Sequence, residues 1–115
     1  MILTYKSIDF INIIMFYCFS MPDILHVMKL TKAINKLENE KEIEKFLKDL
    51  CTPSELNAFE ERWEVAKLLY KKDMSYRDIA KTLKTSTATV TRVARFLFNE
   101  TNKGYQIALR KLINE

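Results

Sequence analysis

The chain has 115 residues, of which 48% are hydrophobic and 30% are charged. This length and balance indicate one globular domain with enough apolar residues for a core of its own. One glycine and two prolines argue against a loop-rich all-β fold, whose tight turns need those residues, and favour helices joined by short connections. One histidine and two cysteines leave little material for catalysis or metal binding, which argues against an enzyme.

The charge is mildly basic and unevenly spread. The net charge of +4 by itself gives only a weak indication of nucleic-acid binding. Residues 75–115, however, carry eight basic and three acidic side chains, whereas residues 29–64 carry seven basic and nine acidic ones. Contact with a polyanion is therefore expected in the C-terminal half of the chain.

Residues 10–19, FINIIMFYCF, form an apolar run near the N-terminus. The run is too short to span a bilayer, and no cleavage site of a secretory signal follows it. Its composition would suit a buried strand or an aggregation-prone tail. Alternatively, residues 1–20 are a dispensable appendage, and residues 21–115 form the single working domain.

Cysteine and histidine usage favours structural roles. Cys18 and Cys51, in a chain without a recognisable signal, indicate a reducing compartment and hence the cytoplasm. His26 lacks partners for a metal site and a nucleophile for general-base catalysis, so we interpret it as a residue on a helix face.

Apolar residues at helical spacing predict helices over residues 23–38 and 43–50. Thr52-Pro53-Ser54-Glu55 is a capping box with proline at the first helical position, and it predicts a helix from 53 to about 72. Two apolar stripes cover much of the circumference of that helix. A helix apolar on so many faces is typical of the centre of a domain or of a dimer.

Two serines predict the next two helix starts. Ser75 precedes a short helix, 76–83, and Ser86 precedes a helix from 87 to about 99. Residues 102–104 break the chain again before a last helix, 105–113. The sequence therefore predicts an all-α fold of about six helices.

Residues 76–95 fit a helix-turn-helix. Ala80 is small where the two helices must approach, and Ile79, Leu83, Val90 and Val93 are the apolar positions that lock them together. The second helix turns small and hydroxylated residues outward at its N-terminus, where the backbone N–H groups and the dipole favour phosphate. Lys84 stands where glycine is usual, which predicts a distorted or 3₁₀-like turn. A plain helical hairpin is the alternative interpretation.

Several segments together resemble the Trp repressor superfamily, and in particular its YerC/YecD branch. They are TPSEL (52–56), MSYRDIAKTL (74–83), STATVTRV (86–93) and KGYQIAL (103–109), with Arg62 in the helix between the first two. The resemblance covers roughly residues 22–113. It implies an intertwined homodimer that regulates transcription, as a repressor, by binding a two-fold operator in double-stranded DNA.

The resemblance also implies site residues. By family analogy Arg77, Thr87, Ala88 and Thr91 face DNA. Charge and position add Lys81, Lys84, Thr85, Ser86 and Arg95. In the tryptophan-binding repressor a corepressor pocket lies beside the recognition helix, and the matching positions here are Thr52, Arg62, Thr89 and Arg92.

Two departures from that pocket concern the effector. Val93 replaces the pocket's glycine and Phe96 its serine, so both put bulk where an indole ring would lie. Tryptophan is therefore not expected as the corepressor, no cofactor is predicted, and the identity of any other effector stays open. The alternative function is a protein-interaction dimer that kept the fold without reading DNA.

Overall fold

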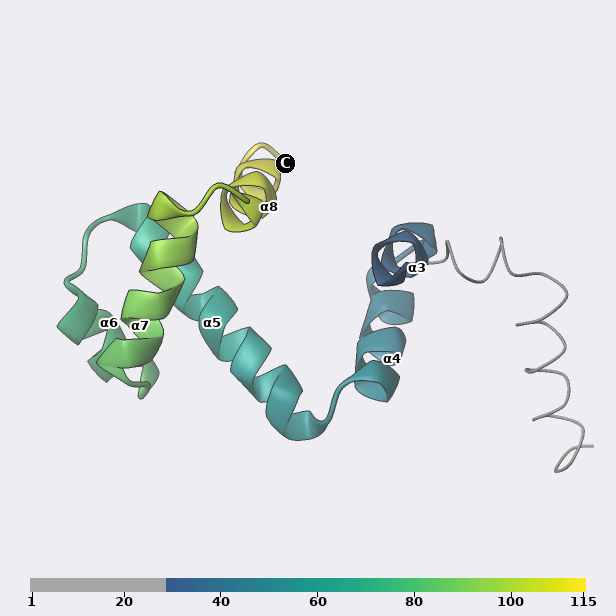
Figure 1. The fold of residues 1–115 in the computed structure, drawn as a ribbon, viewed down its shortest axis with the longest axis horizontal. Helices are drawn as coiled ribbons and strands as arrows, with labels where there is room; N and C mark the ends of the chain where they lie inside the picture. Colours follow the sequence, from purple (N-terminus) through teal and green to yellow (C-terminus); the bar gives the residue numbers. More distant parts are fainter. Residues whose placement is uncertain (1–28) are drawn as a thin grey trace, which may run out of the picture. The chain divides into compact units, whose positions relative to one another are not determined.

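The computed structural model describes residues 29–115, and in this part of the chain the fold is entirely helical (Figure 1). The elements, in chain order, are α3 (Leu30–Lys36), α4 (Glu40–Leu50), α5 (Pro53–Lys71), α6 (Tyr76–Leu83), α7 (Thr87–Ala94), the π-helical turn η1 (Arg95–Asn99) and α8 (Gly104–Ile113). The all-α expectation is thus confirmed. The interpretations of residues 1–20, Cys18, His26 and the start of the helix expected from residue 23 lie outside the described residues.

The capping box forms as the sequence predicts. The Glu55 N–H donates to Thr52 Oγ1 at 3.2 Å, and the Thr52 N–H donates to Glu55 Oε1 at 3.0 Å. Pro53 follows at the first helical position, where its missing N–H costs nothing. The bond from the Thr52 N–H, and then the side-chain bond to Thr52, hold the pKa of the Glu55 carboxyl below its ordinary value of about 4.5. Local sequence therefore fixes where α5 starts.

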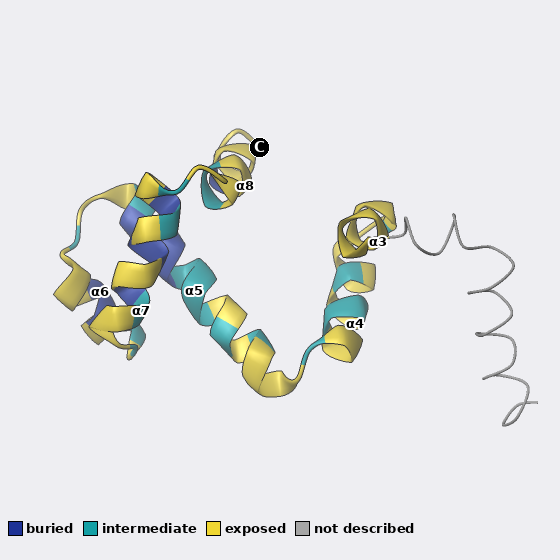
Figure 2. Cartoon of the chain, viewed as in Figure 1, coloured by how far each residue is buried: buried dark blue, intermediate teal, exposed yellow. Residues whose placement is uncertain are grey.

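Residues 47–115 form a compact unit around the C-terminal half of α5. Helices α6 and α7 pack against α5 and against each other, and α8 packs against η1 (Figure 1). The buried residues gather where these helices meet (Figure 2). They are Val65, Ala66, Leu69, Ile79, Ala80, Val90, Val93, Ala94, Leu97 and Leu109.

The N-terminal half of α5 is left largely uncovered by the other elements of its own unit. Phe59 is 48% exposed, and Leu56 and Ala58 are only half-buried. Burial of α5 is confined to Val65, Ala66 and Leu69 (Figure 2). The wide apolar circumference predicted for this helix thus finds partners in its own unit along only part of its length.

Helices α3 and α4 contain no buried residue. Residues 29–46 belong to a separate unit, and the apolar side chains of α4 at Ile43, Phe46 and Leu47 are half-buried. Leu30 and Leu50 are each 50% exposed. The helix expected over 23–38 ends at Lys36, and the helix expected over 43–50 begins earlier, at Glu40.

The helix expected from 87 to about 99 changes its hydrogen-bonding pattern at residue 95. Its α-helical part ends at Ala94, and the Glu100 N–H then donates to the Arg95 carbonyl oxygen at 3.1 Å, five residues back. Such π-turns are rare and are often found at functional sites. Ala94 and Leu97 stay buried at ordinary helical spacing, so the apolar pattern gives no sign of the wider turn.

The break before the last helix falls within residues 102–104, as the sequence predicts, and α8 begins one residue earlier than expected, at Gly104. Lys103, with φ 56° and ψ 24°, takes the left-handed conformation, while Gly104 has an ordinary φ and is the first residue of α8. A Cβ at Gly104 would meet nothing within 4 Å. The reversal of the chain therefore occurs at the lysine and not at the glycine.

Candidate nucleic-acid interface and adjoining cavity

Both helices of the predicted helix-turn-helix start at serine caps. The Asp78 N–H donates to Ser75 Oγ at 3.1 Å at the start of α6. At the start of α7 the Thr89 N–H donates to Ser86 Oγ at 3.1 Å, and the hydroxyls of Ser86 and Thr89 lie 3.0 Å apart. Each cap satisfies an amide that the helix cannot satisfy itself, so the N-terminus of α7 is held in place by residues of its own first turn.

The turn between α6 and α7 is regular, which corrects the expected distortion. Lys84 adopts the left-handed conformation, with φ 55° and ψ 42°. The Thr85 N–H donates to the Ala80 carbonyl oxygen at 2.9 Å, the long backbone bond of a Schellman motif. This bond satisfies a helix-end carbonyl and helps to offset the roughly 1–2 kcal/mol that a side chain costs in this conformation. A lysine therefore performs the role usual for glycine.

The inward positions of the motif are those that the sequence predicts. Ile79 and Val90 are fully buried, Val93 is 1% exposed and Ala80 is 6% exposed. Leu83 is half-buried and packs against the same cluster. The close approach of α6 and α7 thus rests on the small Ala80 and the apolar positions around it.

The opposite face of α7 is open to solvent. Thr87, Ala88 and Thr91 of α7 are exposed, and so is Arg95, the first residue of η1. They line a shallow hollow together with Arg92 and Phe96. Of the other predicted DNA contacts, Arg77, Lys81, Lys84 and Ser86 are exposed, and Thr85 is half-buried. The predicted residues of α7 therefore lie on one accessible surface.

Two arginines on this surface already have partners, which sequence reasoning missed. The Arg92 guanidinium lies over the Phe96 ring, 4.8 Å from its centroid. Arg95 Nε lies 2.8 Å from Glu100 Oε1, and its guanidinium is 5.9 Å from the same ring centroid. Nothing in the spacing of residues 95 and 100 suggests this pair, because it depends on the π-turn.

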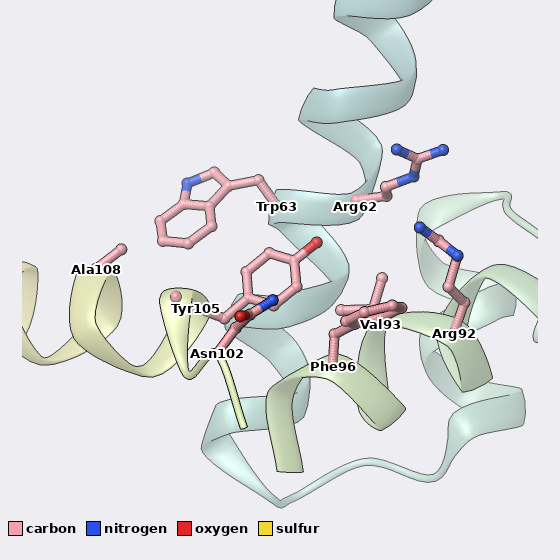
Figure 3. Close-up of a pocket in the computed structure, with 9 residues that line it drawn as sticks. Arg62, Trp63, Arg92, Val93, Phe96, Asn102, Tyr105 and Ala108 are labelled. Atoms are coloured by element: carbon pink, nitrogen blue, oxygen red, sulfur yellow. The ribbon is translucent and has the colours of Figure 1, made fainter. Parts of the chain in front are cut away.

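A cavity of about 450 Å³ lies between α5, α7, η1 and α8 (Figure 3). It is lined by Arg62, Trp63, Arg92, Val93, Phe96, Asn102, Gly104, Tyr105 and Ala108. The rings of Trp63 and Tyr105 stack with centroids 6.5 Å apart and planes inclined by 19°. The volume falls within the usual range of small-molecule pockets.

The structure brings together four of the residues singled out for the effector pocket. Arg62, Arg92, Val93 and Phe96 all line the cavity. Thr89 does not line it, because its hydroxyl turns to the Ser86 cap. Thr52 is likewise the cap of α5. The sequence did not predict the other five lining residues, because their positions depend on how α8 packs. They are Trp63, Asn102, Gly104, Tyr105 and Ala108.

The model of the Trp repressor protein family matches residues 26–113. The chain belongs to the Trp repressor family. Protein YerC of Bacillus subtilis, itself described as uncharacterized, is 36% identical over 84 residues, which cover 73% of this chain and 79% of that protein. The expected resemblance to YerC-type relatives is thereby confirmed, together with the helix-turn-helix regulator fold of the family.

Solved structures agree with the family assignment. A TrpR-like protein from Eubacterium eligens superposes with a TM-score of 0.67 at 39% identity, over 76% of this chain and 89% of that one. A Trp repressor candidate from Staphylococcus aureus superposes with a TM-score of 0.66 at 37% identity, over 75% and 84% of the two chains. The family's fold is regulatory and not that of an enzyme.

Two further findings concern the part of this family member that the structure describes. Residues 29–115 contain no group of three or more His, Cys, Asp or Glu side chains placed to hold a metal ion. Within the same range, no helix has the length and apolar character needed to cross a membrane.

Proposed function

We propose that the protein is a sequence-specific DNA-binding regulator of transcription, acting as a repressor in the cytoplasm. The observation that carries this proposal is the exposed face of α7, where Thr87, Ala88 and Thr91 lie beside Arg92 and Arg95. Small and hydroxylated residues let the helix enter a major groove, and threonine and arginine are common partners of base edges and phosphates.

The surroundings of α7 support phosphate contacts. Arg77 and Lys81 are exposed on α6, and Lys84 is exposed in the turn. No acidic side chain other than Asp78 lies in α6 or α7. These cations beside the recognition helix would bind phosphates that border a groove, and the resulting affinity would fall with salt through counterion release.

We further propose that the working unit is a homodimer that binds a two-fold operator. The uncovered apolar side chains support a second copy as the missing partner, because a monomer would leave them in water. They are Leu30, Ile34, Leu50, Phe59, Tyr76, Phe98, Ile107, Leu112 and Ile113. Two recognition helices related by a two-fold axis would read half-sites about 34 Å apart.

We propose that tryptophan is not the ligand of the cavity. Val93 and Phe96 form part of its wall, and Val93 is also packed into the core, so its isopropyl group has no room to retreat. Arg62 and Arg92 could hold an anionic group by charge-assisted hydrogen bonds. The protein is proposed to bind DNA without tryptophan, and an effector for this cavity would need a shape other than that of an indole.

Selection of bound sites from random duplex DNA tests the proposal. Recovery of a two-fold motif is expected. Arg77→Ala should then weaken binding to it by about 1–3 kcal/mol and relax the preference at one position. Lys41→Ala removes a charge from an exposed residue of α4, outside the helix-turn-helix, and serves as the matched control. No enriched sequence at all would favour the protein-interaction dimer instead, whereas equal binding of the two variants to a recovered motif would refute the contact of Arg77 with DNA.

A further inference from the structure

We infer that Glu100 is a specificity-determining residue that holds Arg95 away from DNA phosphates and so lowers the affinity for non-specific DNA. Arg95 is the first residue of η1, directly after α7, and lines the same hollow as Thr87, Ala88 and Thr91. By position it is a cation beside the face that we propose to bind DNA. The inference rests on the proposed DNA-binding function and adds a residue to it that lies outside the helix-turn-helix.

The first step is the contact itself. Arg95 Nε donates to Glu100 Oε1 at 2.8 Å. The guanidinium also lies 5.9 Å from the centroid of the Phe96 ring. A phosphate that approaches this arginine therefore meets a guanidinium whose charge is balanced by a carboxylate and whose one face lies near an aromatic ring. It also meets the negative charge of Glu100 itself.

The second step is that the π-turn creates this pair. Residues five apart in an α-helix lie about 140° apart around the axis, because one turn takes 3.6 residues. In η1 the Glu100 N–H donates to the Arg95 carbonyl oxygen at 3.1 Å, which brings the two residues next to each other. A residue of α8 stabilises this π-turn, because Gln106 Nε2 donates to the Leu97 carbonyl oxygen at 2.6 Å.

The third step concerns strength. The side chain of Arg95 is 68% exposed and that of Glu100 is 34% exposed. Ion pairs this accessible to water are weak. The pair can therefore open when base contacts hold the helix against its correct site, but it opposes the purely electrostatic attraction that dominates binding elsewhere on DNA. Weak neutralisation at this position thus lowers non-specific binding more than specific binding.

The test measures binding of a random-sequence DNA duplex by fluorescence anisotropy at several salt concentrations. Glu100→Gln keeps an oxygen that can accept from Arg95 and removes only the charge. We expect about threefold tighter binding at low salt, from the loss of one repulsive charge near a phosphate. We also expect the slope of log K against log salt to steepen by about 0.9, the value for one more phosphate contact.

Further variants distinguish the specific effect of the Arg95–Glu100 pair from a general effect of removing one negative charge. Glu64→Gln removes the same charge from another exposed pair, Glu64–Lys67 on α5, and should leave the salt slope unchanged. Arg95→Gln should weaken binding, because it leaves Glu100 unbalanced. The double variant Arg95→Gln/Glu100→Gln should return to within about twofold of the parent chain, since the parent pair is neutral as well.

The outcomes separate this inference from the proposed function. If the parent chain binds no duplex, the DNA-binding function fails, and the inference with it. If the parent chain binds but Glu100→Gln has the same affinity and salt slope as Glu64→Gln, only the proposed role of the Arg95–Glu100 pair is refuted. Weaker binding by Glu100→Gln also refutes it, because Glu100 would then present Arg95 to DNA. Circular dichroism and thermal melting confirm that each variant is folded before its binding is compared.

Discussion

Replacing Lys84 by glycine or alanine should separate its effect on stability from its effect on DNA binding. In the left-handed conformation a side chain costs roughly 1–2 kcal/mol, a cost that glycine avoids. Glycine in turn loses about 0.5–1 kcal/mol through the greater freedom of the unfolded chain. Lys84→Gly is therefore expected to be more stable than Lys84→Ala by about 0.5–1 kcal/mol, which is the difference between these terms. Both variants lose the same charge, so they should bind DNA equally weakly.

The measurement pairs denaturation with DNA titration. A difference of about 1 kcal/mol corresponds to roughly 4–8 °C in Tm for a domain near this size. Salt titrations should flatten by about 0.9 in slope for both variants if Lys84 meets one phosphate. All melts are compared at one protein concentration, because association makes Tm depend on concentration.

Lys103 provides the matched control. It has the same backbone conformation, with φ 56°, but precedes α8 and lies outside the helix-turn-helix. Glycine should exceed alanine in stability there as well, without a change in the salt slope. Equal stability of the alanine and glycine variants at Lys84 would refute the left-handed turn. An unchanged salt slope would refute its contact with phosphate.

The remaining predictions follow from dimerisation, the caps and the cavity. Light scattering behind a sizing column should give twice the 13.6 kDa of one chain, and a folded monomer at micromolar concentration would contradict the dimer. Ser86→Ala should cost about 1 kcal/mol of stability, because the Thr89 N–H loses its partner, whereas Ser86→Gly should cost only a few tenths. Because the folded pKa of Glu55 is depressed, its stabilising effect should be complete above about pH 4.5 and be lost as the pH falls through the folded pKa. The free energies of unfolding of Glu55→Gln and of the parent chain, measured by urea titration, should therefore converge in acid. A difference between them that does not change with pH would exclude this linkage. Calorimetry with millimolar L-tryptophan should give no saturable heat, since overpacking at Val93 costs typically about 1–3 kcal/mol, or about tenfold in affinity per 1.4 kcal/mol.

Local signals explain why most helix starts could be predicted. Thr52, Ser75 and Ser86 each accept a hydrogen bond from an amide three residues ahead, so a short stretch of sequence is enough to fix the start. The buried positions of α6 and α7 follow from their apolar spacing in the same way. Lys84 shows where such local prediction fails. Its residue type alone suggested a distorted turn, but the hydrogen bond from the Thr85 N–H to the Ala80 carbonyl oxygen stabilises a regular one.

The parts of the candidate site that the sequence did not reveal depend on contacts between distant residues. Trp63 and Tyr105 are 42 positions apart, and they stack only because α8 packs back toward α5. The pair of Arg95 and Glu100 requires the π-turn, and the apolar pattern is the same with or without that turn. Residues whose role depends on such geometry cannot be identified from spacing.

The π-turn at Arg95–Asn99 also bears on how relatives should be aligned. A turn closed five residues back holds one residue more than an α-helical turn, so removing one residue there would leave a continuous helix able to keep its backbone bonds. Relatives one residue shorter between the recognition helix and the last helix should therefore have their gap placed within 95–99. An alignment that puts the gap in the loop at 100–103 would shift Phe96 and Leu97 by one position and mispair the cavity wall with the core.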